Sequence, residues 1–168
     1  MAEGILRHRA AAAGLDVHVS SAGVLQGGAP ATDHAVKVSA ERGIDISHHV
    51  SRRLDKAMVE DADLIIAMAR EHLREAVVAS PPAFARTFTL RELVRRIEAN
   101  PQASLEELHR GREIRDYIKG DPADDVADPV GLSLNKYDET IRDLDALLGV
   151  VVGWLPNLTS ASDTKAAS

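Results

Sequence analysis

The sequence contains no cysteine, and this absence excludes more chemistry than any other feature of its composition. Without cysteine, residues 1–168 can form no disulfide, hold no cysteine-ligated metal and supply no thiolate nucleophile. Aromatic residues are also few, at 3%. No apolar run approaches the roughly 20 residues that span a bilayer, and the first residues, with Glu3 early, do not resemble a secretory signal. We therefore expect a cytoplasmic protein without a membrane partner.

The residues that are present are those of an ordinary globular protein. Apolar residues make up 45% of the 168 residues, which is enough for the core of one domain. We expect this domain to cover residues 1–155, and the small, polar tail 156–168 to be disordered. The net charge of −6 argues against a general nucleic-acid partner. The composition does not indicate an oligomeric state.

Helical and strand patterns alternate along the chain. An Ala-rich helix is expected from Ala2 to about Ala13, followed by a strand at 17–20, where apolar and polar residues alternate. Two further strands are expected at 63–68, a continuous apolar run, and at 86–90. Further helices are expected at 33–42 (capped by Thr32 or Asp33), 55–60, 71–79, 91–99, 104–118 and 133–154. This alternation predicts an α/β fold of three layers, with helices on both faces of a small parallel sheet.

Two segments near the start carry a resemblance. Met1-Ala-Glu-Gly-Ile-Leu, followed by Val19-Ser-Ser-Ala-Gly, resembles the low molecular weight protein-tyrosine phosphatase family, and the similarity extends to about Leu148. In that family the corresponding helix follows a phosphate-binding loop of the form Cys-x5-Arg-Ser-Pro. The resemblance implies a four-stranded sheet whose first strand precedes this loop and lies between the second and third strands. Residues 1–168 begin at the helix and include neither that strand nor the loop.

The resemblance also implies a reaction. A cysteine thiolate, whose pKa is lowered by a helix N-terminus and an arginine, attacks phosphorus and forms a phosphoenzyme. The pair Asp128-Pro129 resembles the family's Asp-Pro pair, whose aspartic acid protonates the leaving phenolate and later activates water. The implied substrate is a phosphotyrosine protein or a small aryl phosphate. No cofactor is implied.

From the sequence alone, Asp128 is not the only candidate for the acid. Four aspartates occur between Gly120 and Pro129, and they could simply form a solvated acidic loop: Asp121, Asp124, Asp125 and Asp128. Asp121-Pro122 is a rival Asp-Pro pair, and we prefer Asp128 because Gly131 follows it, as in the family's Asp-Pro-x-x-Gly with one residue fewer. Val130 stands where many relatives have an aromatic residue that contacts the phenolic substrate, so the substrate preference is open.

Ser21 and His48 match family positions that hydrogen-bond to an asparagine of the phosphate loop and support its shape. From the residues alone, Ser21 reads equally as a turn residue and His48 as a loop or partly buried histidine. The adjacent pair His48-His49 is a poor metal site because neighbouring side chains diverge, so we expect no bound metal.

Two functions are consistent with these observations. The first is a phosphatase whose upstream strand and Cys-x5-Arg loop lie outside residues 1–168, and the second is a non-catalytic binding module derived from the same family. The retained Asp-Pro pair favours the first. Residues 1–168 alone are expected to be inactive by the cysteine route. Each buried backbone group left without a partner costs roughly 1–3 kcal/mol. The missing interior strand therefore implies either that the native product is longer or that residues 1–168 fold poorly.

Overall fold

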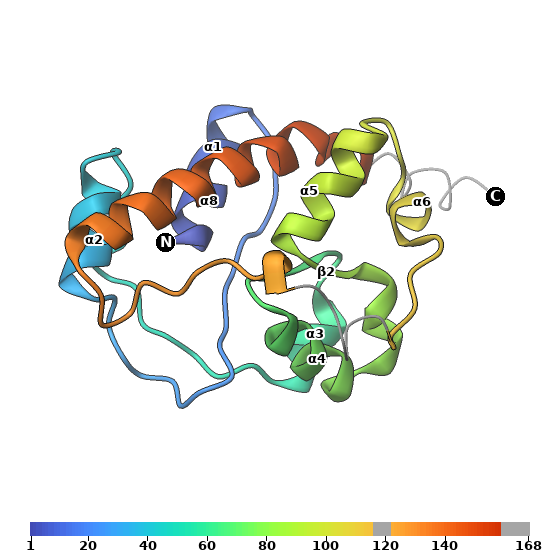
Figure 1. Cartoon of the computed structure of the whole chain (residues 1–168), viewed down its shortest axis with the longest axis horizontal. Coiled ribbons are helices and arrows are strands. Elements are labelled where there is room, and N and C mark those ends of the chain that lie inside the picture. Colours follow the sequence, from blue (N-terminus) through green and yellow to red (C-terminus); the bar gives the residue numbers. More distant parts are fainter. Residues whose placement is uncertain (116–121, 159–168) are drawn as a thin grey trace. The chain divides into compact units, whose positions relative to one another are not determined.

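The computed structural model describes residues 1–115 and 122–158 (Figure 1). The chain forms two compact units. The N-terminal unit consists of Met1–Arg53 and Ala127–Val152, and the sheet unit consists of Leu54–Val126 and the chain from Gly153 onward. Within the described ranges, no helix is both long enough and apolar enough to cross a membrane. We describe each unit separately.

The sheet unit contains a parallel pair of strands, β1 (Ile65–Ala67) and β2 (Thr87–Thr89), in which Ile66 is paired with Phe88. Both strands pack against α4 (Arg70–Ala79) and α5 (Leu90–Ala99), so that helices lie on both sides of the sheet. Helix α3 (Lys56–Asp61) packs on α4, and a 3-10 segment, η1 (Pro81–Arg86), leads into β2. The strands expected at 63–68 and 86–90, and the α/β class, are confirmed.

Side chains cap α3 and another helix of the sheet unit, α6 (Leu105–His109). Asp55 accepts a hydrogen bond from the backbone N–H of Met58 at 2.9 Å, which satisfies one of the free donors at the start of α3. Ser104 and Glu107 form a reciprocal capping box at the start of α6. Each cap fixes where its helix begins.

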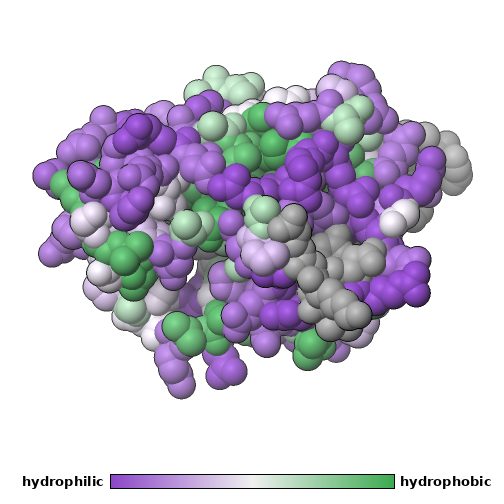
Figure 2. All heavy atoms as spheres, viewed as in Figure 1, coloured by the Kyte–Doolittle hydropathy of each residue, from purple (hydrophilic) through white to green (hydrophobic). Residues whose placement is uncertain are grey.

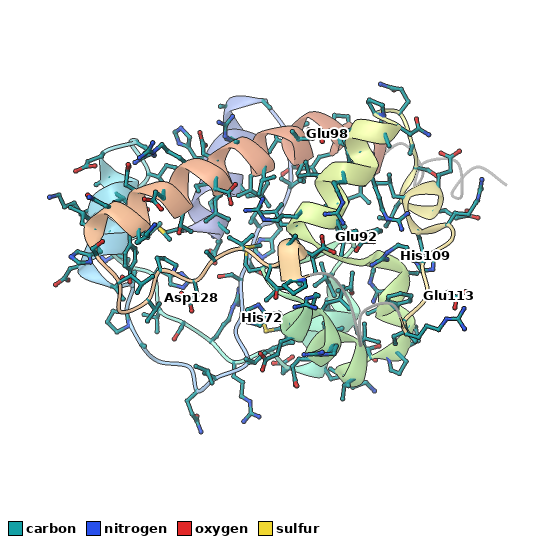
Figure 3. All side chains as sticks on the ribbon, in the orientation of Figure 1. His72, Glu92, Glu98, His109, Glu113 and Asp128 are labelled. Carbon is teal, nitrogen blue, oxygen red and sulfur yellow. The ribbon has the colours of Figure 1, made fainter. Side chains whose placement is uncertain are left out.

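Helix α6 ends at His109, so the prediction that it continues to about residue 118 is wrong. The chain turns at Gly111, whose φ is +77°, and this turn allows Arg112 to reach the interior. The Arg112 side chain is fully buried, pairs with Glu92 of α5 at 2.8 Å, and lies 3.8 Å from the centroid of the Phe88 ring. Figure 3 shows Glu92 on α5 and His109 at the end of α6. Tertiary contacts of Arg112 therefore override the local helical pattern.

The N-terminal unit is built from α1 (Ala2–Ala12), α2 (Asp33–Ala40) and most of α8 (Leu134–Trp154). Two ion pairs join α1 and the end of α2 to α8, Arg9 with Asp145 at 2.7 Å and Arg42 with Asp138 at 2.8 Å. Thr32, rather than Asp33, caps α2 by accepting a hydrogen bond from Ala35 N–H, and the Thr32 hydroxyl also bonds to the hydroxyl of Tyr137.

Helix α1 approaches its neighbours unusually closely at Gly4. A Cβ atom at this position would lie 2.7 Å from a methyl group of Ile46 and 2.9 Å from one of Ile44. Gly4, although helical, is therefore a packing residue that no larger side chain can replace without a shift.

The prediction of a strand at residues 17–20 is wrong. Residues 15–20 have no assigned strand or helix, and the pairing that follows them is limited to single bridges, Gly23 with Arg53 and Pro30 with Val50. Among residues 1–115 and 122–158, no strand lies beside Val17–Ser20, so its alternating pattern has no partner to form a sheet.

The predicted disordered tail overlaps ordered structure at its start. Residues 156–158 are helical, and the Asn157 side-chain amide donates to the carbonyl oxygen of Pro101 at 3.0 Å. Just before them, the indole of Trp154 donates to the carbonyl oxygen of Ala103. Residues 159–168 lie outside the described residues. The single-domain boundary at 1–155 stays a prediction.

Exposed apolar residues are scattered. The large ones among the described residues are Leu25, Val50, Val78, Ile114, Val130 and Leu132. On the face shown in Figure 2, hydrophobic residues form small separate areas among hydrophilic ones. Such isolated apolar side chains are normal on protein surfaces and do not indicate a binding face.

Candidate active site

Glu3, in the first turn of α1, is the centre of a polar cluster. Its carboxylate accepts hydrogen bonds from the Ser21 hydroxyl and the Arg7 guanidinium, and lies 3.8 Å from Nδ1 of His49. The Glu3 side chain is only 15% exposed. Burial opposes ionisation of this carboxyl, but the hydrogen bonds from Ser21 and Arg7 outweigh it and lower the pKa of Glu3. A carboxylate at a helix N-terminus is also favourable to the helix dipole.

Two neighbouring loops hold Ser21 in place. Arg52 Nε donates to the carbonyl oxygen of Ser21 at 2.8 Å, and Gly23 N–H donates to the carbonyl oxygen of Arg52 at 2.9 Å. Gly28 N–H donates to Ser51, and a Cβ at Gly27 would lie 2.9 Å from Arg52 Cα. The loops therefore run side by side in contact, and the position of Ser21 depends on both.

The two adjacent histidines have different surroundings. His49 is half-buried and faces Glu3, whereas His48 is exposed. His48 lies near Asp45, whose pKa is lowered chiefly by hydrogen bonds from Ser47, with a smaller contribution from His48. The structure thus brings Ser21 and His49 together through Glu3, and places His48 outside this cluster. The resemblance singled out His48, and nothing else in the sequence indicated that His49 would face Glu3.

Asp128 lies in the loop that precedes α8 (Figure 3). Its side chain is exposed, and its Oδ1 accepts a hydrogen bond from the backbone N–H of Val130 at 3.0 Å, which closes an Asx-type turn. Pro129 is buried, and Gly131 has a φ of +80°. Within the described residues, Asp128 shares no hydrogen bond or ion pair with Glu3 or Ser21.

The other described aspartates of this loop are engaged in ion pairs. Asp124 is 9% exposed and contacts Arg95 at 2.5 Å. Asp125 accepts hydrogen bonds from Arg70, and these hydrogen bonds lower the pKa of its carboxyl. The alternative interpretation, in which these aspartates form a solvated acidic loop, is therefore wrong for Asp124 and Asp125. The rival residue Asp121 lies outside the described residues.

Comparison with known proteins identifies the family. Residues 1–107 match the family described as low molecular weight phosphotyrosine protein phosphatase. The chain belongs to this family. It is 33% identical over 151 residues to a protein-arginine-phosphatase of Bacillus subtilis, an alignment that covers 88% of this chain and 82% of the relative. The predicted family, and with it the classes of hydrolase and protein phosphatase, are confirmed.

Solved structures of the same family also resemble this chain. A low molecular weight protein tyrosine phosphatase from T. tengcongensis is 34% identical with a TM-score of 0.69, covering 90% of this chain and 86% of that one. A structure of the arginine phosphatase YwlE is 31% identical with a TM-score of 0.71, covering 92% of this chain and 86% of that one. In that YwlE structure, a serine that replaces a cysteine in the active site is phosphorylated.

Proposed function

We propose that this chain carries the acid–base part of a phosphoprotein phosphatase, with Asp128 as the general acid. The observation that supports this role is the contrast within one loop: Asp124 and Asp125 are held in ion pairs, whereas Asp128 is exposed and fixed by a local turn. An exposed carboxyl beside a rigid proline is suited to donate a proton to a leaving group. Such assistance is worth roughly 10²–10⁴-fold in rate.

The phosphate would bind at the N-terminus of α1. The helix dipole and free N–H groups there favour an anion. Ser21 and His48 were the predicted supports of the phosphate loop, and we propose that His49 shares this role because it faces Glu3 with Ser21. Residues 1–168 contain no cysteine, so hydrolysis through a phosphoenzyme needs a nucleophile from outside these residues.

Two classes of substrate have a leaving group that Asp128 could protonate. The first is phosphotyrosine or a small aryl phosphate, in which Asp128 protonates the phenolate as the P–O bond breaks. The second is phosphoarginine, in which the same proton goes to the guanidine nitrogen as the P–N bond breaks. Similarity to a protein-arginine-phosphatase over 88% of the chain supports the second class. Val130, which is 65% exposed, would offer the substrate an aliphatic side chain at the position after Pro129, where many relatives have an aromatic residue.

The test joins the upstream strand and Cys-x5-Arg loop of a family member to Met1 and measures kcat/KM, which reports the step in which the leaving group departs. The substrates are phosphoarginine and aryl phosphates with graded leaving groups. We expect Asp128→Ala to lower kcat/KM by roughly 10²–10⁴-fold for poor leaving groups. Good leaving groups need no proton, so their kcat/KM should change little. Asp121→Ala is the matched control and should leave kcat/KM unchanged. Equal losses of kcat/KM for all leaving groups, or a loss only in Asp121→Ala, would refute the role of Asp128.

A non-catalytic binding module is the second candidate, since residues 1–168 lack the nucleophile. This candidate predicts that the extended protein binds phosphate esters without turning them over. A cytoplasmic location, and the absence of nucleic-acid and membrane partners, stay predictions.

A further inference from the structure

The chain just before Asp128 is tied to the sheet unit by three separate interactions. Arg70 uses both its backbone N–H (2.8 Å) and its guanidinium (3.1 and 3.2 Å) to bind the two carboxylate oxygens of Asp125. Val126 N–H donates to the carbonyl oxygen of Met68 at 2.8 Å. Asp124 pairs with Arg95 on α5. Residues 124–126 are therefore attached at the end of β1, at the start of α4 and on α5.

The bond from Arg70 is stronger than that of an ordinary surface ion pair. Asp125 engages a guanidinium through both oxygens and also accepts the first free N–H of α4, so its charge lies at a helix N-terminus. The Arg70 and Asp125 side chains are 20% and 33% exposed, so solvent screens the pair only in part.

The covalent chain carries this attachment to Asp128. Only Ala127 separates Val126 from Asp128, so the Cα atoms of these two residues lie at most about 7 Å apart. On the other side, Pro129 is buried and its carbonyl oxygen accepts a hydrogen bond from Leu132 N–H at 2.9 Å, just before α8 begins. The backbone of Asp128 thus follows closely on the attached residues 124–126, while its side chain is exposed.

We propose that Arg70 is a positioning residue for Asp128, acting through Asp125. Arg70 holds the backbone of residues 124–126, and this restricts the conformations from which the Asp128 carboxyl donates its proton. The inference rests on the proposed acid role of Asp128 for its catalytic consequence. The restriction of the loop itself can be measured without catalysis.

The test is amide hydrogen exchange of residues 1–168 with Arg70→Ala. We expect the exchange of Val126, Val130 and Leu132 N–H to accelerate by about tenfold or more, because local opening of the loop no longer has to break the Arg70–Asp125 bonds. Amides of α1 should exchange as before. The matched control is Arg42→Ala, which removes an Arg–Asp pair of similar exposure, 27% and 33%, in the N-terminal unit. It should leave the three loop amides unchanged.

Unchanged exchange of the loop amides in Arg70→Ala, or equal acceleration throughout the chain, would overturn the proposal. In the extended, cysteine-bearing protein, Arg70→Ala should lower kcat/KM about tenfold or more for poor leaving groups and change it by less than about twofold for good ones, because the acid is misplaced and phosphate binding is not. A lower kcat/KM that does not depend on the leaving group would also count against the proposal. If Asp128→Ala has no effect on kcat/KM but Arg70→Ala still loosens the loop, the acid role fails and the attachment of the loop stands.

Discussion

The two units use buried charge in different ways. In the sheet unit, Glu92 and Arg112 are 5% and 7% exposed, and the guanidinium of Arg112 stacks on Phe88 and donates a hydrogen bond to the carbonyl oxygen of Thr87 in β2. In the N-terminal unit, Glu3 is partly accessible and its partner Arg7 is 58% exposed. A fully enclosed charge pair can do little besides hold a fold, whereas a charge near solvent can also meet a ligand. We therefore infer that the Glu92–Arg112 pair stabilises the fold, whereas the Glu3 cluster is a candidate to contact a ligand.

The largest effect on stability should come from Glu92→Ala. This change leaves the guanidinium of Arg112 buried without its carboxylate, and breaking a buried pair in this way costs roughly 3–5 kcal/mol. Glu3→Ala, the matched change in the N-terminal unit, should cost about 1 kcal/mol or less because Arg7 returns to water. Urea unfolding of both variants measures the difference. Similar losses in the two variants would remove the distinction between the clusters.

A second comparison uses glycines in helices of the two units. Gly4→Ala should lower the free energy of unfolding by about 1–3 kcal/mol, because the new methyl meets Ile44 and Ile46. Gly153→Ala is the control, since a Cβ there meets nothing within 4 Å. It should stabilise α8 by up to about 1 kcal/mol through helix propensity. Thermal unfolding distinguishes these opposite signs, and a gain for Gly4→Ala would show that α1 does not pack as described.

The smallest expected effect is a dependence on pH. Hydrogen bonds from Arg70 lower the pKa of Asp125 in the folded state, so this carboxylate contributes stability above its unfolded pKa of about 3.9. That contribution is lost as the pH falls through the lower, folded value. Urea midpoints between about pH 2 and pH 6 should therefore fall less steeply in Asp125→Asn than in the parent chain. Arg70→Ala should show the same flattening, and a steep fall retained in both variants would contradict the pairing.

Local chemistry was enough to predict much of the sheet unit. The caps at Asp55 and Ser104 depend on residues a few positions away, and the apolar run at 63–68 has its partner strand in the same unit. Val17–Ser20 has an equally good alternating pattern but no adjacent strand in the part of the chain that the structure describes, so its pattern forms no sheet there. A strand pattern predicts a strand only where a neighbour exists.

Features that depend on distant contacts were not predictable. The sequence contains no sign that Arg112 would enter the core, since an arginine inside the predicted helix 104–118 is typical of a surface position. The involvement of Glu3 and His49 likewise depends on loops that meet only in the fold. Family resemblance predicted roles for Ser21, His48 and Asp128. These roles stay predictions, and the structure adds the surroundings of each side chain.

The most direct test of the central claim is hydrolysis measured on two chains side by side, residues 1–168 alone and the same residues preceded by the strand and Cys-x5-Arg loop of a family member. The substrates are phosphoarginine and phosphotyrosine. We predict no turnover by residues 1–168, and turnover by the extended chain that Asp128→Ala strongly reduces. Turnover by residues 1–168 that Asp128→Ala abolishes would contradict the account. So would an extended chain whose rate of hydrolysis is unchanged by Asp128→Ala.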